Sequence, residues 1–180
     1  MVIEPGDILS FWRLAGPDKW FTRSDALDLE VRTRFLPVYE AACSGALAGW
    51  EANPDGALAL VIALDQFPRN MFRGQRRAFA ADPLARVVAE RALARGFDRL
   101  FEVPERRFFY MPFMHSEALA DQERCAALCR AADDAEGVKH ADIHAEIIRR
   151  FGRFPHRNRA LGRATTPEEQ AFLDAGGFAG

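Results

Sequence analysis

The sequence predicts an all-α protein, and two features of its patterning support this class. Apolar residues recur at helical spacing along most of the chain, as in Leu27, Val31 and Phe35. Strand signals are nearly absent, because short apolar runs such as residues 61–64 are flanked by alanine and leucine and not by turn residues. We expect about eight or nine helices, and the short loops between them predict antiparallel pairs.

The bulk composition indicates a soluble globular protein. The chain has 180 residues, the length of one domain, so we predict a single all-helical domain over residues 1–180. Hydrophobic residues make up 49% and charged residues 28%, which is ordinary for such proteins. The formal net charge of −2 argues against a dedicated nucleic-acid binder, whose binding face is usually basic.

Two further absences suggest where the protein works. The N-terminal residues lack a basic stretch followed by an apolar core, so we expect no signal peptide. No apolar run approaches the roughly 20 residues that span a bilayer. We therefore expect a cytoplasmic protein with no membrane partner, and the oligomeric state is left open.

The first helices begin at recognisable capping residues. A short amphipathic helix is expected over residues 5–14, with Pro5 in its first turn. Ser24 is a suitable N-cap for the next helix. Pro37 is expected to kink or split that helix, because proline removes a backbone donor and crowds the preceding turn. The second piece is expected over residues 36–48.

The helix that organises the chain starts after Asp55, its expected N-cap, and is apolar on every side over residues 58–64. A helix without a polar face is one that other helices surround. Asp65 and Gln66 follow in its last turn, and Pro68 is expected to end it. A carboxylate there meets the negative end of the helix dipole and loses hydration, so Asp65 needs a cation nearby.

The middle of the chain carries further helix boundaries. Asp82 is a candidate N-cap with Pro83 at the first helical position. Gly96 has the position of a left-handed residue just past the end of that helix. Another helix is expected over residues 104–115, and Pro112 should bend or end it.

The last third is expected to hold three helices. One covers residues 119–134, and Gly137 should separate it from a helix over residues 139–151 whose buried stripe includes Ile143. Thr166 and Glu169 have the spacing of a capping box, which opens a final short helix.

Two corners of similar sequence follow apolar helices. The first corner, residues 66–70, reads Gln-Phe-Pro-Arg-Asn, and the second corner, residues 153–158, reads Arg-Phe-Pro-His-Arg-Asn. Arginine binds carboxylate or phosphate in a two-pronged geometry, so the corners are candidates to hold an anionic group. The predicted ligand-binding residues are Asp65, Gln66, Arg69, Asn70, Arg73, Asp121, His144, Arg153, Arg157 and Asn158.

The same corners also fit a purely structural role. In this alternative Arg69, Arg73 and Arg157 pair internally with carboxylates of the chain, and the corners hold the fold together. The candidate partners are Asp65, Glu117 and Asp121. Both roles are compatible, because a partly neutralised arginine cluster still accepts a ligand.

Neither the histidines nor the cysteines indicate a metal site. His140 and His144 have helical pair spacing, but no glutamate follows His140, which lies in a first helical turn that frays. The three cysteines, Cys43, Cys125 and Cys129, lack further ligands at metal spacing. They are interpreted as small buried residues in a reducing compartment. We expect no metal and no cofactor.

Three long motifs give the chain a family resemblance. They are Leu64-Asp65-Gln66-Phe67-Pro68-Arg69-Asn70 with Phe72-Arg73-Gly74, Met111-Pro112-Phe113-Met114-His115-Ser116-Glu117 with Asp121-Gln122-Glu123, and Phe151-Gly152-Arg153-Phe154-Pro155-His156-Arg157-Asn158 with Leu161-Gly162-Arg163. Together they resemble the bacterial domain-of-unknown-function 924 family, over nearly the whole chain. The resemblance implies an array of antiparallel helix pairs similar to tetratricopeptide-repeat proteins, with a concave face. It implies no activity.

We expect a helical-repeat-like protein that binds a small anionic molecule or an acidic peptide end in a polar pocket. One alternative is a hydrolase or lyase in which His115, Glu117 and His156 exchange protons, with or without a metal. Another is a protein–protein interaction module without catalysis, which rests on fold analogy alone.

Overall fold

The computed structural model describes residues 3–178, and this range contains helices and loops but no strand, which confirms the all-α class. Met1 and Val2, part of the segment in which no signal peptide is expected, lie outside the described residues. The chain divides into two compact units, which we describe separately: unit 1 comprises residues 1–73 and 77–112, and unit 2 comprises residues 74–76 and 113–180. The single domain and the repeat-like array stay predictions.

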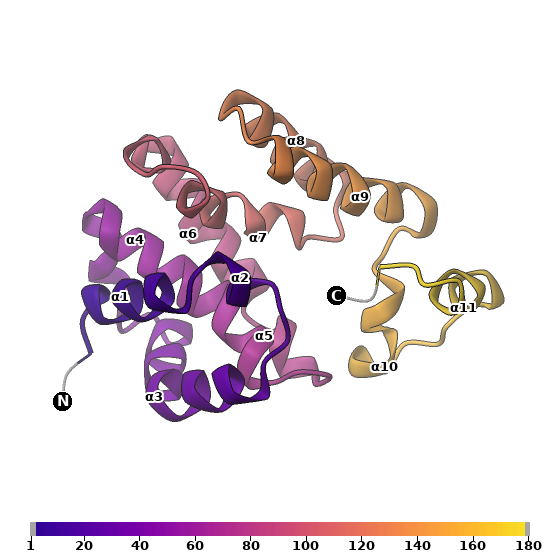
Figure 1. Ribbon diagram of the computed structural model, residues 1–180, viewed down its shortest axis with the longest axis horizontal. Coiled ribbons are helices and arrows are strands. Elements are labelled where there is room, and N and C mark those ends of the chain that lie inside the picture. The colour runs from indigo at the N-terminus through magenta and orange to yellow at the C-terminus, as the bar shows by residue number, and fades with distance from the viewer. Residues whose placement is uncertain (1–2, 179–180) are drawn as a thin grey trace. The chain divides into compact units, whose positions relative to one another are not determined.

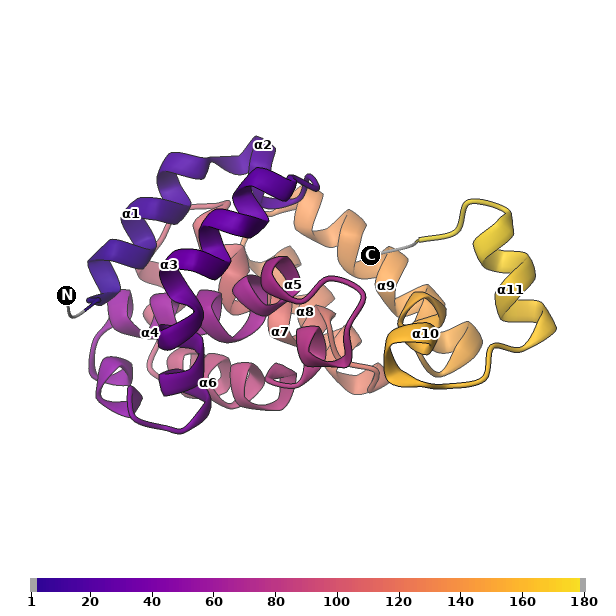
Figure 2. The same ribbon diagram turned by 90° about the horizontal axis from the view of Figure 1, so that it is seen from below.

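Unit 1 is built around one central helix (Figures 1 and 2). Its elements are α1 (Pro5–Ala15), α2 (Pro17–Trp20), α3 (Asp25–Cys43), a 3₁₀ turn (Ala48–Ala52), α4 (Pro54–Val61), a π-helical turn (Ile62–Gln66), α5 (Phe67–Met71), a 3₁₀ turn that begins in the other unit (Arg76–Phe79), α6 (Asp82–Ala94) and two further 3₁₀ turns (Phe97–Leu100 and Glu105–Phe109). The short α7 (Met111–Met114) contains the boundary between the units.

The central helix runs through α4, the π-helical turn and α5 without a break. All residues from 56 to 68 are buried, as expected for a helix apolar on every side, and the helix packs against α1, α3 and α6. Asn53 caps it by accepting the Gly56 N–H at 2.9 Å, so the expected cap Asp55 is wrong.

The prediction that Pro68 ends the central helix is also wrong. The N–H of Phe67 bonds to the carbonyl of Ile62, which widens the chain into a π-helical turn. Pro68 then falls in the first turn of α5, where a missing N–H costs no intrahelical bond. The widened turn carries the buried polar pair Asp65 and Gln66.

Helix α3 likewise continues through its proline. The expected break at Pro37 is absent, and α3 extends from Asp25 to Cys43. Its buried side packs on the central helix, with the Phe35 and Phe67 rings stacked 4.9 Å apart between centroids. Tertiary packing of this face therefore outweighs the one backbone bond that proline removes. Cys43 lies at the exposed end of α3, against the expectation that it is buried.

Unit 2 contains a helix pair, α8 (Leu119–Ala131) and α9 (Ala135–Phe151), which lie side by side (Figure 1). It ends with a 3₁₀ turn (Pro155–Arg157), α10 (Asn158–Leu161) and α11 (Pro167–Asp174). Asp134 caps α9 by accepting the N–H of Gly137 at 2.9 Å, so Gly137 belongs to α9 and does not separate the helices. A Cβ on Gly137 would lie 2.3 Å from a carboxylate oxygen of the capping Asp134 and 2.9 Å from the sulfur of buried Cys129, so the cap and the contact with α8 favour glycine here.

The buried face of α9 differs from the expected stripe. Ala141, His144, Ala145 and Ile148 are buried, whereas Ile143 is 41% exposed, which corrects its assignment to the core. Residues 141, 144, 145 and 148 follow the three-to-four spacing of one helix face, and Ile143 lies outside this face. The polar side chain on this face, His144, is therefore held inside unit 2.

Several boundary predictions are confirmed. The capping box at the start of α11 is present: the Thr166 hydroxyl accepts the Glu169 N–H at 3.2 Å, and Glu169 accepts the Thr166 N–H at 2.8 Å. Gly96 has a positive φ of 70° just after α6. The predicted N-cap Asp82 is wrong by one residue: helix α6 begins at Asp82 itself, Ala81 is in the capping position, and Pro83 is the second helical residue. No helix over the described residues is both long and apolar enough to cross a bilayer.

Candidate functional site

Arg69 of the first corner is committed to two buried carboxylates. Its guanidinium forms a two-pronged pair with Asp82, at 3.0 and 3.1 Å, and also lies 3.2 Å from a carboxylate oxygen of Asp65. Asp65 is fully buried and accepts a second hydrogen bond, from the Gln66 amide at 2.6 Å. Burial lowers the pKa of Arg69, but the charges of Asp65 and Asp82 outweigh it and raise the pKa above its ordinary value.

The other donors of the first corner are directed at Asp28. The Asn70 amide donates to Asp28 at 2.7 Å, and two guanidinium nitrogens of Arg73 donate to the same carboxylate. Asp28 lies in the first turn of α3, so it ties α3 to α5. The arginines of this corner therefore pair internally, as in the structural alternative. Arg73, however, pairs with Asp28 and with none of the expected partners.

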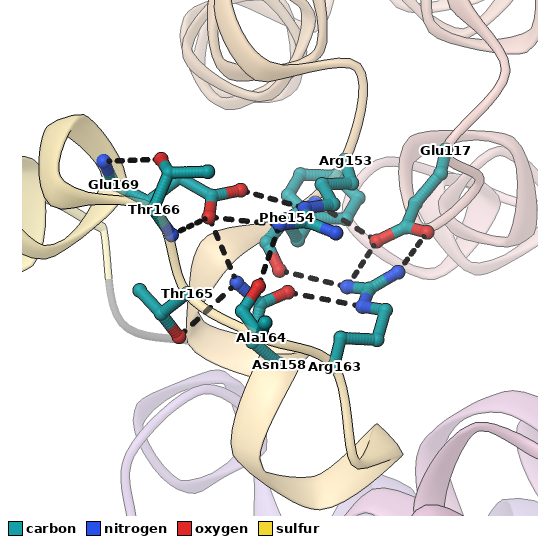
Figure 3. A network of polar contacts seen from close by, with 9 residues as sticks. All are labelled: Glu117, Arg153, Phe154, Asn158, Arg163, Ala164, Thr165, Thr166 and Glu169. Atoms are coloured by element: carbon teal, nitrogen blue, oxygen red, sulfur yellow. Dashed lines mark hydrogen bonds and ion pairs between the residues drawn. The ribbon is translucent and has the colours of Figure 1, made fainter.

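The second corner belongs to unit 2 and is held in a network of its own (Figure 3). Glu117 accepts hydrogen bonds from two nitrogens of Arg163, at 2.7 and 2.9 Å, and from the backbone N–H of Phe154 at 2.8 Å. Arg163 also donates to the Asn158 side-chain oxygen at 3.0 Å. The two corners thus lie in different units.

Glu169 forms the other half of this network. Two nitrogens of Arg153 donate to its carboxylate at 2.6 and 2.9 Å, and the Asn158 amide donates to it at 3.2 Å. Asn158 is fully buried and joins the two halves, because its oxygen binds Arg163 while its nitrogen binds Glu169 (Figure 3). Arg153 and Asn158, both predicted as ligand donors, therefore hold the end of the chain together.

Both carboxylates are kept ionised by this network. Burial raises the pKa of Glu117, but hydrogen bonds from Arg163 and from the Phe154 backbone outweigh it and lower the pKa. The hydrogen bond from Arg153 is the main cause that lowers the pKa of Glu169 to about 2. Glu117 is thus an acceptor at neutral pH, and this environment disfavours the proton-donating role considered for it.

Three histidines of unit 2 are linked by ring contacts, directly or through Phe154, and we call them the histidine cluster: His115, His144 and His156. The ring centroids of His115 and His144 are 6.5 Å apart. The His144 and His156 rings lie 5.5 and 5.6 Å from the ring of Phe154, which is fully buried. Unit 2 therefore brings together one predicted ligand-binding residue, His144, and the two histidines considered as proton-exchanging groups, and their roles stay predictions.

Arg157 brings a positive charge to the same place. Its guanidinium carbon lies 4.5 Å from the centroid of the Phe154 ring, in cation–π geometry, and its side chain is buried. Burial is the main cause of the lowered pKa of His144, and the Arg157 charge is the smallest of the causes that lower it. Asp121, the remaining predicted residue, lies in the first turn of α8.

His144 is held as a neutral imidazole. Burial, followed by the neighbouring His115, lowers its pKa to about 4. Its Nδ1 lies 2.8 Å from the His140 carbonyl, which only accepts hydrogen bonds, so Nδ1 carries the proton and Nε2 a lone pair. Within residues 3–178, Nε2 makes no hydrogen bond. The buried face of α9 thus presents a hydrogen-bond acceptor on a ring that packs against Phe154.

Three residues of this region were not predicted as site residues. Arg163 and Glu169 are the internal partners of the second corner, and Phe178 contacts the rings of His144 and His156. The capping box predicted that Glu169 lies in the first turn of the last helix, but it gave no sign that Arg153 pairs with its carboxylate. No group of three or more His, Cys, Asp or Glu side chains suited to a metal ion occurs among the described residues.

Comparison with known proteins agrees with the sequence motifs. A solved structure of a protein of unknown function from Agrobacterium tumefaciens is 45% identical, covers 95% of this chain and 97% of its own, and superposes with a TM-score of 0.92. None of the curated proteins matches the chain. The family described as "Bacterial protein of unknown function (DUF924)" matches residues 8–177. With 170 of its 180 residues matched, the chain belongs to the DUF924 family.

Proposed function

We propose that unit 2 binds a small anionic molecule, or the acidic end of a peptide, between Arg157 and His144. The observation that carries this proposal is that both side chains contact the Phe154 ring: the Arg157 guanidinium carbon lies 4.5 Å and the His144 ring 5.5 Å from its centroid. Arg157 supplies a guanidinium for an oxyanion, and the Nε2 lone pair of His144 supplies an acceptor.

This pair of groups selects for an anion that also carries a hydrogen-bond donor. A neutral imidazole with its proton on Nδ1 cannot donate from Nε2, so a bare oxyanion receives no hydrogen bond from His144. Hydrogen phosphate, a hydroxy acid or a protonated carboxyl group beside a carboxylate offers both an anionic oxygen and a hydroxyl. The ligand class that fits best is therefore a partly protonated or hydroxylated anion.

The first corner contributes less to this proposal than the sequence suggested. Arg69, Arg73 and Asn70 are directed at the carboxylates of Asp28 and Asp82 within unit 1. A ligand there must displace ion pairs whose partners are mostly buried, which leaves an unpaired carboxylate at a cost of about 3–5 kcal/mol. The first corner is therefore the less favourable place for an anion.

A second candidate is acid–base catalysis by His144, of the hydrolase or lyase kind. It is favoured by the lowered pKa of His144, because strongly perturbed ionisable groups cluster at active sites. At neutral pH His144 is present as the base, whereas Glu117 is ionised and paired with Arg163. The enzyme candidate predicts turnover of aryl phosphates or esters that is lost in His144→Gln, while the binding candidate predicts none.

Thermal unfolding with added anions tests the binding proposal. Inorganic phosphate at ten times its Kd should stabilise the protein by about 1.4 kcal/mol, with chloride at equal ionic strength as the reference. Arg157→Gln and His144→Gln should each abolish this gain. Arg130→Gln is the matched control, because Arg130 is an exposed arginine of the same unit that pairs with Asp142.

Two results would contradict the proposal. One is a parent protein that phosphate does not stabilise beyond chloride. The other is an unchanged phosphate gain in Arg157→Gln, which would place the anion elsewhere. Arg157→Lys covers the case in which Arg157→Gln fails to fold, since it keeps the charge but loses the two-pronged geometry. We expect a reduced phosphate gain in that variant.

A further inference from the structure

The indole of Trp12 in α1 is buried with an unpaired donor. Only 2% of this residue is exposed, and within the described residues its Nε1–H donates to no acceptor. The neighbouring Trp20 shows the usual arrangement, because its own Nε1 donates to the Trp12 carbonyl at 2.6 Å. Buried polar groups are nearly always hydrogen-bonded in native proteins, so the Trp12 donor points to a missing acceptor, such as a ligand atom.

Trp12 also lines a small cleft in unit 1. Its ring shares the wall with five other buried apolar side chains: Leu9, Trp20, Leu58, Ile62 and Phe108. The empty space of the cleft is about 180 Å³ with its open mouth included, below the roughly 300 Å³ at which pockets for drug-sized ligands begin. A ligand of this cleft is therefore a compact molecule of a few heavy atoms, or a short part of a larger one.

An ion pair forms the rest of the cleft wall. Arg13 donates to both carboxylate oxygens of Glu105, from Nε at 2.7 Å and from Nη2 at 2.9 Å. The two side chains are 48% and 26% exposed, so they are the part of the wall that solvent reaches. Their charges cancel, and the cleft therefore presents no net charge to a ligand. Because exposed ion pairs contribute little to stability, this pair can open without unfolding the unit.

We propose that this cleft binds a small neutral molecule with an apolar body and a hydrogen-bond acceptor, such as a cyclic ketone. The Trp12 N–H donates to the acceptor, and the apolar wall packs against the body. The indole nitrogen has almost no exposed surface in the structure, so the Arg13–Glu105 pair opens to admit the ligand. A charged ligand is disfavoured, because burying an ion against an apolar wall without a partner is costly. The inference is independent of the anion site, which belongs to unit 2.

Nitrogen–proton NMR of the indole groups, with cyclopentanone as the probe, tests the inference on the full-length protein. The Trp12 indole proton should move downfield and saturate, because it gains an acceptor. Trp50 is the internal control, since it belongs to the 3₁₀ turn Ala48–Ala52 and not to the cleft wall, and its indole proton should stay in place. Trp20→Phe and Trp50→Phe assign the three resonances by elimination, so the test needs no variant of Trp12.

Two matched probes separate a hydrogen bond from simple burial. Methylenecyclopentane has the shape of the ketone without its oxygen, and it should cause no downfield shift of the Trp12 proton. Trp12→Phe should weaken cyclopentanone binding at least tenfold but methylenecyclopentane binding less than threefold, because only the ketone uses the donor. Cyclopentanecarboxylate should bind the parent protein at least tenfold more weakly than the ketone.

Three results would overturn the inference. The first is a Trp12 proton that cyclopentanone does not move downfield, and the second is the same downfield shift with methylenecyclopentane. The third is a carboxylate that binds as tightly as the ketone. If Trp12→Phe does not fold, the shifts measured on the parent protein still decide between a hydrogen bond and simple burial.

The ion pair supplies a separate test of the opening. Arg13→Ala removes one partner and part of the wall, so cyclopentanone should bind this variant at least threefold more tightly than the parent protein. Arg23→Ala is the matched control and should leave the affinity unchanged, because Arg23 is 75% exposed and pairs with Asp25 at the surface of the same unit. An affinity that Arg13→Ala lowers or leaves unchanged would overturn the inference that the pair opens for the ligand.

Discussion

Glu117 receives both terminal nitrogens of Arg163, at 2.7 and 2.9 Å, across 46 residues of sequence. The same carboxylate accepts the backbone N–H of Phe154, the residue whose ring supports Arg157 and His144. The Glu117–Arg163 ion pair therefore fixes the backbone at Phe154, the residue on which the candidate site is built. These contacts give Glu117 a structural role in unit 2.

Replacing Glu117 by glutamine should destabilise the protein by about 1–3 kcal/mol, the usual worth of hydrogen bonds to charged groups. Urea unfolding at pH 7 measures this loss. Glu146→Gln is the control, because Glu146 is 73% exposed and 3.7 Å from Arg149, and it should change stability by less than about 0.5 kcal/mol. Equal effects of the two substitutions would mean that the Glu117–Arg163 pair contributes nothing to stability.

Glu169 gives the protein a predicted acid dependence. Its pKa is lowered from 4.5 to about 2 in the folded protein, so the folded state binds fewer protons than the unfolded state between these values. The stabilisation from Glu169 is complete above pH 4.5 and is lost as the pH falls toward 2. Unfolding midpoints in urea should therefore drop over this window, and Glu169→Gln should flatten the dependence.

The neighbouring residue supplies the control for this pH profile. Glu168 pairs with Arg150 at the surface, with 65% of its side chain exposed. Glu168→Gln should leave the slope of stability against pH close to that of the parent. A profile in which Glu169→Gln keeps the full parental slope would contradict the role assigned to the Arg153 pair.

Asp65 should be indispensable for the stability of unit 1. It is fully buried and shares Arg69 with Asp82, so Asp65→Ala removes one partner of a buried ion pair at a cost of about 3–5 kcal/mol. The double variant Asp65→Ala/Arg69→Ala should lose less than the sum of the single losses, because the two side chains interact. Denaturant titrations of the four proteins give this coupling.

Asp142→Ala is the control for the coupling experiment. Asp142 pairs with Arg130, and both side chains are more than half exposed, so its loss should be below about 1 kcal/mol. Additive losses for Asp65 and Arg69 would show that the two residues do not stabilise each other.

Local signals in the sequence predicted the class and many element ends, because capping chemistry is decided by neighbours in the chain. The capping box of Thr166 and Glu169 and the left-handed Gly96 are examples. The helix ends predicted at Pro37 and Pro68 were wrong, because the packed helices continue through both prolines. A π-helical turn has no local signature that separates it from a helix end.

Partners far apart in the sequence were not predictable from spacing. The carboxylates of Asp28 and Asp82 were not connected with the first corner, although they bind Arg73 and Arg69. Any of the 24 basic side chains is a chemically acceptable partner for a carboxylate, so only the fold selects one. His115 and His156 were predicted as proton-exchanging candidates and His144 as a ligand-binding residue, but no sequence signal indicated that Phe178 contacts two of these rings.

The most direct test of the account is the response of the His144 imidazole to inorganic phosphate, followed by nitrogen NMR at pH 7 and assigned with His144→Gln. We predict a neutral ring with its proton on Nδ1, because its pKa lies near 4, and a saturable shift of Nε2 as phosphate binds. The shift should vanish in Arg157→Gln and persist in Arg130→Gln. An Nε2 resonance that phosphate does not move, or that moves equally in Arg157→Gln, would contradict the anion site.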